Sequence, residues 1–438
     1  MKTSSYSPRT YVADIIIWSL AGVAVVLWAL APRLEPAFSS FGSSATAIGQ
    51  ILGLVGVSLF AVNLILSARL KWIEYIFQGL NRMYVQHSRY GQIAFMALLF
   101  HPLLLSIQYS AGSFLGAAKF IFPSSNVAMD LGIFGLGSMI LLIVLTLYLR
   151  PKYNLWKWTH KFFGFSFFLG YLHVLLIPST VSSYQPLRIY VLALAALGLM
   201  AFFYRTVLGR FLVRRFHYSV VAVQQLNDTI TQVVMRPKGQ RLSYVPGQFL
   251  FVGFEDPAVG SESHPFSIVS SPTDENLEIA VKNLGDYTAR LPQLSSGSSV
   301  YLEGPYGTFF SSLRVSNQHI WVAGGIGITP FISKARSLVG DSSQKVDLYY
   351  CVKNIGEAAY VDELRQLEQS LQGRFRLFIF CSDVDGRITA DYISTTSGGL
   401  SDKDIYLCAP PVMIQAMKGQ FVKQGINPRR LHSEEFNF

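Results

Sequence analysis

Four histidines in the first half of the chain have a spacing that could bind metal. His87 and His101 lie 14 residues apart on one apolar stretch, and His160 and His173 lie 13 residues apart on another. Each pair would be about 20 Å apart along a helix, which rises 1.5 Å per residue. Ionisable side chains inside membrane-spanning helices are costly and usually functional. We therefore expect two pairs of facing histidines at different depths in the membrane, with His87 opposite His160 at one level and His101 opposite His173 at the other.

Two facing imidazoles on neighbouring helices can bind one haem iron from both sides. The chain has no Cys-x-x-Cys-His sequence, so such a haem would be held without a covalent bond, as a b-type haem. Ordinary packed histidines, a zinc site and a proton relay are the other interpretations, although imidazoles split over two levels suit zinc geometry poorly. Two side chains 13 residues apart point about 140° away from each other around an ideal helix. This spacing predicts a distortion between His160 and His173. Gly164 and Gly170 lie in that interval and could permit it.

The elements that must hold these histidines are long apolar runs. Hydrophobic residues make up 51% of the chain and charged residues only 14%, whereas a soluble protein carries about 25% charge. A helix needs about 20 apolar residues to cross a membrane. Six stretches qualify, at residues 13–32, 45–68, 86–110, 128–149, 158–179 and 187–208.

The net charge of +10 points to membrane topology and not to nucleic acid, because the basic residues gather at the ends of the apolar runs. The predicted cytoplasmic side has Arg69, Lys71, Arg82, Arg150, Lys152, Lys157, Arg205, Arg210, Arg214 and Arg215, and the opposite side has Arg33, Lys119 and Arg188. This bias places the N-terminus and the second half of the chain in the cytoplasm, with the helices in the cell (inner) membrane. Residues 1–10 are too short and polar for a cleavable signal. The three cysteines all lie in the second half, where a reducing cytoplasm suits them.

The second half reads as two soluble domains. Alternating segments at 217–223, 229–235 and 248–254 predict a small antiparallel β-barrel over residues 211–315. Strands at 320–323, 346–352 and 375–380 then alternate with helices, which predicts a parallel α/β domain over residues 316–438. The predicted fold is therefore an α-helical membrane bundle of six spans over residues 1–210, an antiparallel β-barrel and a parallel-sheet nucleotide-binding domain.

The histidine pattern resembles that of the NADPH oxidase and ferric reductase superfamily. In that family the inner and outer pairs on the third and fifth of six spans bind two b-type haems. The resemblance implies that His87 and His160 bind one haem and that His101 and His173 bind the other.

The segment His264-Pro265-Phe266-Ser267 resembles the family's flavin motif. Phe266 could form an aromatic wall for the flavin ring, and the Ser267 hydroxyl could hydrogen-bond near flavin N5, where hydride arrives. The resemblance places His264 beside the pyrophosphate. A core phenylalanine and a turn serine would explain the same residues.

A second element, Gly285-Asp286-Tyr287-Thr288, resembles the family's Gly-x-x-Ser/Thr element. There, backbone amides and a hydroxyl hold the FAD diphosphate. Gly285, Tyr287 and Thr288 are the candidate residues, and Lys282 adds positive charge. An ordinary turn is the alternative. The nearby Gly304-Pro305-Tyr306-Gly307 also matches a family turn, and we interpret it as structural.

The segment from Gly324 to Pro330 lies between a predicted strand and a predicted helix. Its glycines, Gly324, Gly325 and Gly327, could let the backbone approach a pyrophosphate at a helix start, and Pro330 suits the first helical turn. With Thr329 it resembles the Gly-Gly-x-Gly-x-Thr-Pro signature of ferredoxin reductase-like proteins, which bind a nicotinamide nucleotide. A tight strand-to-helix turn is the alternative.

Further along, Cys408-Ala409-Pro410 resembles the family's Cys-Gly-Pro, where the cysteine lies beside nicotinamide C4. In the same family a terminal aromatic residue covers the flavin; Phe436 is the first candidate here and Phe438 the second. A buried structural cysteine and an ordinary apolar terminus are the alternatives.

A 2′-phosphate on the nucleotide would need a cation, and Lys353 and Arg387 are candidates for it. The choice between NADPH and NADH stays open at this point. Ser267, Cys408 and Phe436 are the residues expected to act at the hydride-transfer step.

The resemblance implies an oxidoreductase that moves electrons from cytoplasmic NAD(P)H through FAD and two b-type haems to an acceptor across the membrane. We expect dioxygen, giving superoxide; reduction of a ferric chelate is the close alternative. A non-catalytic conduit to a periplasmic partner protein would need extended, charged outer loops, which are short here. A structural or channel-like protein would leave the flavin and nicotinamide motifs without a role. No obligatory protein partner is expected.

Overall fold

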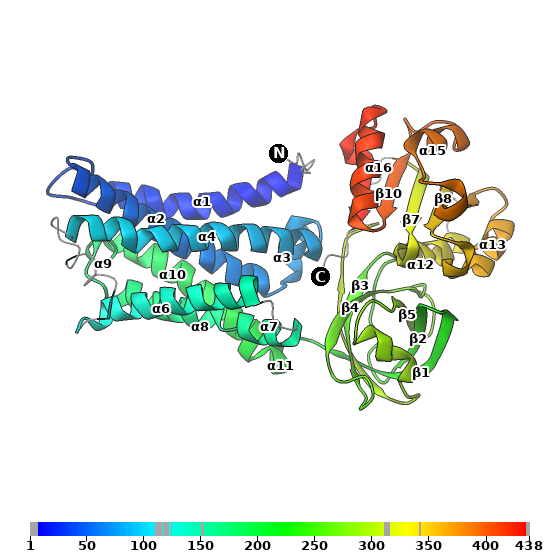
Figure 1. Ribbon diagram of the computed structural model, residues 1–438, viewed down its shortest axis with the longest axis horizontal. Coiled ribbons are helices and arrows are strands. Elements are labelled where there is room, and N and C mark those ends of the chain that lie inside the picture. The colour runs from blue at the N-terminus through cyan, green and yellow to red at the C-terminus, as the bar shows by residue number, and fades with distance from the viewer. Residues whose placement is uncertain are drawn as a thin grey trace. The chain divides into compact units, whose positions relative to one another are not determined.

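The computed structural model describes residues 8–109, 116, 122–123, 125–149, 153–310, 316–340 and 343–434. The chain divides into two compact units. One consists of Pro8–Phe77 and Arg82–Val213, and the other of the chain from Arg214 onward with Gln78–Asn81. Helices make up the first unit, and two sheets with their covering helices make up the second (Figure 1).

Long apolar helices form the first unit. Its described helices are α1 (Pro8–Leu30), α2 (Phe41–Ser67), α3 (Lys71–Phe77), α4 (Leu80–Tyr109), α6 (Val127–Val144), α7 (Tyr153–His160), α8 (Phe163–Leu176), α9 (Thr180–Ser183), α10 (Gln185–Phe202) and α11 (Gly209–Leu212). Five helices in the described part, α1, α2, α4, α6 and α10, are long and apolar enough to cross a membrane. Large apolar side chains such as Val26, Phe134 and Leu197 are exposed on them, as expected of a surface that faces lipid.

The predicted span at residues 158–179 is broken in the structure. Helix α7 ends at His160, Lys161 and Phe162 form a turn, and α8 begins at Phe163. The 14 residues of α8 make a helix of about 21 Å, shorter than the roughly 30 Å hydrocarbon core. Six spans are therefore not confirmed. The break lies between His160 and His173, where the spacing of the histidines predicted a distortion.

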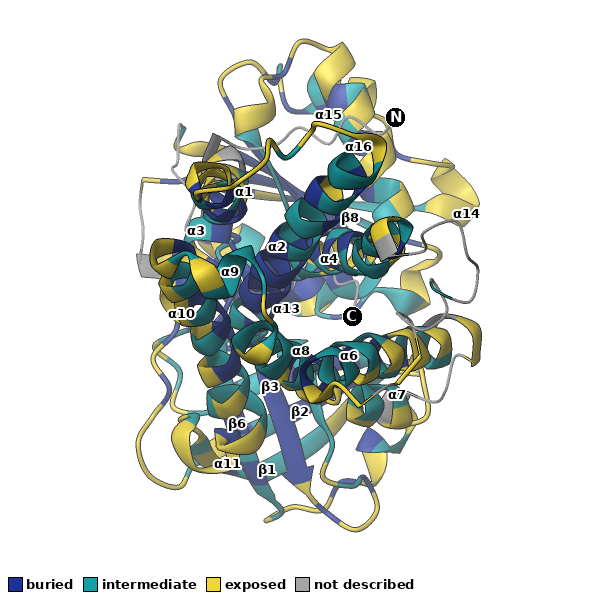
Figure 2. Ribbon diagram, turned by 90° about the vertical axis from the view of Figure 1, so that its left-hand side faces the viewer, coloured by how far each residue is buried: buried dark blue, intermediate teal, exposed yellow. Residues whose placement is uncertain are grey.

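Small residues bring neighbouring helices of the first unit close together. A Cβ atom added at Gly135 of α6 would lie 3.2 Å from the carbonyl oxygen of Ser166 in α8. The hydroxyls of Ser138 and Ser166 are hydrogen-bonded at 2.8 Å across the same pair of helices. Close approach at small residues is the usual way in which membrane helices associate. Helix α2 is the most buried of the five long helices (Figure 2).

The second unit begins with a six-stranded antiparallel sheet. Its strands are β1 (Phe216–Asn227), β2 (Ile230–Pro237), β3 (Phe249–Glu255), β4 (Ser263–Ser267), β5 (Leu277–Lys282) and β6 (Ser299–Tyr306), in the order β4-β3-β6-β1-β2-β5. The strands predicted at 217–223, 229–235 and 248–254 correspond to β1, β2 and β3. The chain just after β4 meets β5 at an isolated bridge between Ile268 and Ile279. The antiparallel sheet is thus confirmed, whereas a fully closed barrel is not.

A five-stranded parallel sheet follows. Its strands are β7 (Gln318–Gly324), β8 (Lys345–Val352), β9 (Phe375–Cys381), β10 (Asp404–Cys408) and β11 (Leu431–Glu434), in the order β11-β10-β7-β8-β9. The main connecting helices are α12 (Thr329–Ser337), α13 (Val361–Ser370), α15 (Ala390–Thr396) and α16 (Pro411–Lys423). Strand order reverses between β7 and β10, and in such sheets ligands bind beyond the carboxyl ends of the strands at that point.

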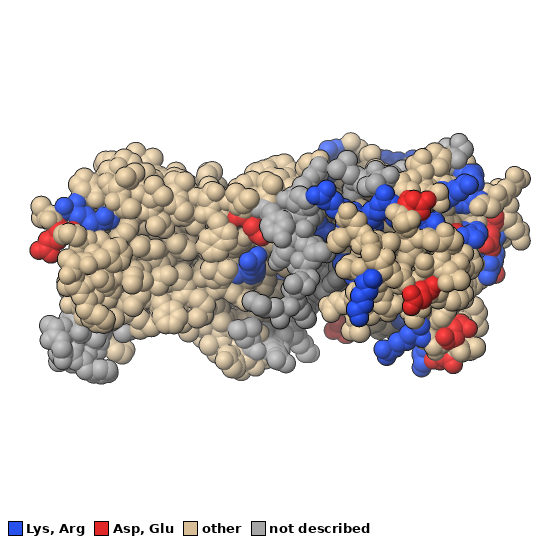
Figure 3. Space-filling model, turned by 90° about the horizontal axis from the view of Figure 1, so that it is seen from above, with Lys and Arg blue, Asp and Glu red and all other residues tan. Residues whose placement is uncertain are grey.

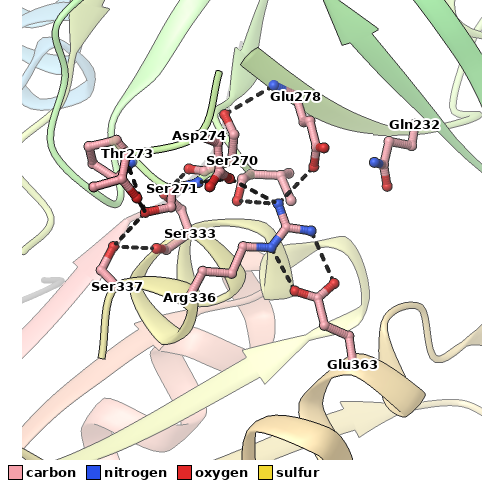
Figure 4. Close-up of polar contacts among 12 residues, drawn as sticks. Gln232, Ser270, Ser271, Thr273, Asp274, Glu278, Ser333, Arg336, Ser337 and Glu363 are labelled. Atoms are coloured by element: carbon pink, nitrogen blue, oxygen red, sulfur yellow. Dashed lines mark hydrogen bonds and ion pairs between the residues drawn. The ribbon is translucent and has the colours of Figure 1, made fainter. Parts of the chain in front are cut away.

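The antiparallel and parallel sheets share a core and a mostly buried ion-pair group. Phe310, after β6, packs on Trp321 of β7 with ring centroids 5.6 Å apart. Arg336 of α12 donates to Glu363 of α13 at 2.6 Å and to Glu278 of β5 at 2.7 Å (Figure 4). Burial alone would lower the pKa of Arg336, but its bonds to Glu363 and Glu278 outweigh burial and raise the pKa. The guanidinium therefore stays charged and joins the two sheets.

We expect Arg336→Met to destabilise the protein by about 3 kcal/mol, because two carboxylates would lose their partner in a mostly buried place. Arg365→Met is the matched control, since Arg365 pairs with Glu368 within α13 and its side chain is 46% exposed. Loss of the Arg365–Glu368 pair should lower the free energy of unfolding by less than about 1 kcal/mol. Thermal unfolding of the two variants, followed by release of flavin fluorescence, measures the difference. Equal shifts would show that Arg336 contributes no more than a surface pair.

Candidate functional site

The structure brings His87 of α4 and His160 of α7 together. Their ring centroids are 6.1 Å apart and the ring planes are inclined at 55°. A metal–imidazole bond is about 2 Å long, so two imidazoles on opposite sides of one iron have their nitrogens roughly 4 Å apart and their centroids somewhat farther. The observed separation of His87 and His160 suits such a pair.

The outer histidines, His101 of α4 and His173 of α8, are also near enough to interact electrostatically. Nδ1 of His101 lies 2.7 Å from the carbonyl oxygen of Gly49, and Nδ1 of His173 lies 2.7 Å from that of Ala128. Nδ1 of His87 lies 3.1 Å from the carbonyl oxygen of Asn63. A carbonyl oxygen only accepts, so each of these Nδ1 atoms carries the proton and each Nε2 keeps its lone pair for a metal.

The donor set fits haem better than zinc. In the described part of the chain, no three His, Cys, Asp or Glu side chains come together in a way that could hold a metal ion. Paired imidazoles with oriented Nδ1 atoms are instead the ligands that a b-type haem uses. His160 differs from the other three, because its buried Nδ1 has no hydrogen-bond partner among the described residues.

The flavin-motif residues lie at one edge of the antiparallel sheet. Edge strand β4 contains Pro265, a position that suits a residue without an amide hydrogen. The ring of His264 lies against that of Tyr287, with centroids 4.0 Å apart and planes inclined at 32°, and its Nε2 lies 2.9 Å from Glu262 Oε2. Ser267 is buried, and Phe266 is partly buried against the core of the sheet. The structure thus joins the two predicted flavin elements through His264 and Tyr287.

The second predicted flavin element is a closed turn. The Thr288 hydroxyl accepts from the amides of Leu284 and Gly285 at 2.9 and 3.0 Å. That hydroxyl, predicted to hold a diphosphate, therefore caps its own turn in this structure. Lys282 Nζ lies 3.4 Å from Glu357 Oε2, so its charge is shared with a carboxylate of the parallel-sheet domain.

The glycine-rich loop after β7 packs tightly on the end of β10. A Cβ atom at Gly327 would overlap the carbonyl oxygen of Cys408, and one at Gly324 would lie 2.7 Å from the Cβ of Ala409. Gly325 has a φ of +55° and no neighbour within 4 Å of an added Cβ, so its face is open. Pro330 lies in the first turn of α12, as predicted, and the Thr329 hydroxyl donates to the carbonyl of Ile326 at 3.0 Å.

Gly307 lies close to both the predicted flavin residues and the predicted nicotinamide residues. A Cβ atom there would lie 3.2 Å from Phe249 and 3.3 Å from Oε1 of Glu434. Phe249 pairs with Ser267 across β3 and β4, and Glu434 pairs with Cys408 across β10 and β11. Ser267, Glu434 and Cys408 thus approach one small region of the second unit. Nothing in the sequence assigned Glu434 a role of its own, although it lies two residues before the predicted terminal aromatic, Phe436.

Cys408 is buried, and burial with the nearby Glu434 carboxylate raises the pKa of its thiol well above the usual value. A raised pKa keeps a thiol neutral, so we expect iodoacetamide at pH 8 to leave Cys408 unmodified in the folded protein. Mass spectrometry before and after denaturation measures this, with the denatured protein as the positive control. Rapid alkylation of folded protein would contradict a neutral, buried thiol.

Lys353 and Arg387 are both exposed at the carboxyl-terminal side of the parallel sheet. Lys353 follows β8, and its carbonyl accepts from the amide of Asp383, which follows β9, at 3.1 Å. The segments that carry the two cations are therefore neighbours. Phe436 and Phe438 lie outside the described residues.

Three family models match successive parts of the chain. They are the ferric reductase-like transmembrane component at residues 52–171, an FAD-binding domain at 215–309 and an oxidoreductase NAD-binding domain at 321–419. This succession confirms the predicted resemblance. The chain has the architecture of the NADPH oxidase and ferric reductase superfamily, with apolar transmembrane helices and flavin- and nicotinamide-binding oxidoreductase domains.

Curated relatives resemble about half of the chain. A flavohemoprotein of Rhizobium meliloti is 26% identical over 233 residues, which is 48% of this chain and 57% of that protein. The ferredoxin reductase component of a 3-ketosteroid-9-alpha-monooxygenase of Mycobacterium tuberculosis is 25% identical over 45% of this chain and 56% of its own length. The chain thus spans little more than half of either relative. Among solved structures, the Amycolatopsis cytochrome P450 reductase GcoB matches 51% of this chain and 70% of its own with 22% identity and a TM-score of 0.45.

Proposed function

We propose that this protein is a transmembrane NAD(P)H oxidase that delivers electrons from cytoplasmic NAD(P)H to dioxygen on the opposite face. The observation that carries the proposal is the pairing of His87 with His160, 6.1 Å apart, in a chain that also has flavin and nicotinamide domains. Each NAD(P)H that is oxidised gives two electrons and one proton, so it reduces two molecules of dioxygen to superoxide.

The four histidines would hold two haems. His87 and His160 would bind one iron, and His101 and His173 the other, about 21 Å away along α4. A haem bound by two imidazoles exchanges one electron at a time. The carbonyls of Asn63, Gly49 and Ala128 hold three of the rings by Nδ1, which would leave Nε2 free to bind a metal.

The second unit would bind the electron donor. A flavin takes two electrons from a hydride and releases them singly, which links a nicotinamide to one-electron carriers. Ser267 would hydrogen-bond near flavin N5, and Cys408 would lie beside the nicotinamide as a neutral thiol. Lys353 and Arg387, which lie on neighbouring segments, favour NADPH over NADH.

Dioxygen is the proposed acceptor, and a ferric chelate is the alternative. Few Lys and Arg side chains lie on the face of the helical unit seen in Figure 3, and dioxygen needs none. Arg33, one of the cations predicted on the opposite side, is exposed, and its guanidinium lies 4.0 Å from the ring of Trp28 and donates to the carbonyls of Trp28 and Ala29. An exposed cation can attract an anionic chelate, so the test includes reduction of a ferric chelate.

The test uses the full-length protein in detergent with FAD and haem. NADPH and NADH are supplied in turn, and cytochrome c reduction is measured with and without superoxide dismutase. Inhibition by dismutase is the expected result. Dismutase-insensitive activity together with anaerobic reduction of a ferric chelate would make the protein a ferric reductase, and no oxidation of either nucleotide would reject the proposal.

A further inference from the structure

The two outer histidines are held by their neighbouring helices in the same way. His101 of α4 is bonded through Nδ1 to a carbonyl of α2, that of Gly49, and His173 of α8 is bonded through Nδ1 to a carbonyl near the start of α6, that of Ala128. Both distances are 2.7 Å. The pairs α2–α4 and α6–α8 therefore repeat one contact.

A glycine follows each of these carbonyls by four residues, one turn later on the same helical face. A Cβ atom at Gly53 would lie 2.7 Å from Nδ1 and 2.8 Å from Cε1 of His101. One at Gly132 would lie 2.8 Å from Nδ1 and 3.0 Å from Cε1 of His173. Carbon atoms in contact prefer about 3.5–4.0 Å, so a methyl group at either position would push the imidazole away.

These two glycines differ from those that bring helices together. The nearest atoms to an added Cβ at Gly198 belong to Ala61, including its backbone, and at Gly56 they belong to Leu98. At Gly53 and Gly132 the three nearest atoms all belong to a histidine ring. Their lack of a side chain thus makes room for an imidazole and not for a neighbouring helix.

We propose that Gly53 and Gly132 are positioning residues for the outer haem ligands. Each glycine, together with the carbonyl one turn before it, forms a seat for one imidazole. The carbonyl fixes which nitrogen carries the proton, and the glycine fixes how near the ring lies to the helix. The inner level is built differently. Nδ1 of His87 lies 3.1 Å from the carbonyl oxygen of Asn63, farther than in the two outer contacts, and Nδ1 of His160 has no partner among the described residues. The inference rests on the proposed haem binding.

The experiment compares Gly53→Ala and Gly132→Ala with two controls in the full-length protein. Gly56→Ala disturbs the packing of α2 on Leu98 but meets no histidine, and Gly137→Ala lies on α6 with nothing within 4 Å of the added carbon. The readouts are haem per FAD, the low-spin ferric signals in electron paramagnetic resonance, and the thermal midpoint. None of these depends on turnover.

We expect Gly53→Ala and Gly132→Ala each to shift or remove one of two ferric signals and leave the other unchanged, with up to half of the haem lost. Gly56→Ala should lower the thermal midpoint but keep both signals, and Gly137→Ala should match the wild type. If Gly53→Ala and Gly132→Ala keep both signals and all haem, the seats have no positioning role. A misfolded protein would lose FAD and haem together. If Gly53→Ala or Gly132→Ala has this effect and Gly56→Ala has it too, the glycines are needed for helix packing and not for seating the imidazoles. A wild-type protein without haem would instead reject the proposed function itself.

Discussion

His101→Leu is expected to remove about half of the haem absorbance of the purified protein. Leucine cannot ligate iron, and the partner imidazole of His173 alone would hold a b-type haem weakly, because that haem has no covalent attachment. The inner pair lies about 21 Å away along α4, so it should keep its haem. His87→Leu should remove the other half, and the double variant should have none.

The pyridine haemochrome assay, normalised to FAD, measures the haem that remains. His217→Leu is the matched control, because His217 is exposed on β1 of the second unit and lies outside the helices that hold the four predicted ligands. Unchanged haem content in His101→Leu would reject the assignment of the outer pair, and loss of both haems would show that the two levels do not fill independently.

The histidine pairing could be predicted from sequence because helix geometry links spacing to depth. The spacing of 14 placed His87 and His101 near one face, and the spacing of 13 required a distortion between His160 and His173. The turn at Lys161 and Phe162 supplies that distortion. Its position could not be predicted, because it depends on packing between helices and not on local propensity.

Contacts that depend on tertiary packing also could not be predicted from the sequence. The carbonyls that hold the Nδ1 atoms belong to residues with no chemical signature, such as Ala128. Glu434 reaches Cys408 only because β11 pairs with β10. Arg336 likewise looks like an ordinary helix cation in the sequence, and its role follows from the approach of β5 and α13. The Gly324–Pro330 motif was recognised correctly as a strand-to-helix loop, but its glycines serve packing as well as an open face.

The close packing of the Gly324–Pro330 loop on the end of β10 leads to the second large expected effect. Gly327→Ala is expected to lower the rate of NADPH-dependent flavin reduction by at least roughly 100-fold, since displacements of about 1 Å at a reacting centre have effects of that size. The added carbon would overlap the carbonyl oxygen of Cys408, which is backbone and cannot rotate away. Either the loop or the end of β10 must move, and both border the predicted nicotinamide position.

Gly419→Ala is the matched control, because Gly419 lies on α16 of the same sheet domain with nothing within 4 Å of an added carbon. Alanine is the better helix former by about 1 kcal/mol, so this variant should be at least as stable as the wild type. Stopped-flow reduction of the bound flavin gives the rate, and FAD content shows whether the antiparallel sheet is intact. A Gly327→Ala protein that reduces its flavin at the wild-type rate would mean that the loop and Cys408 do not form the nicotinamide site. A loss of rate with full FAD content would place the defect in the parallel sheet, where β7 and β10 lie side by side and the loop after one presses on the end of the other.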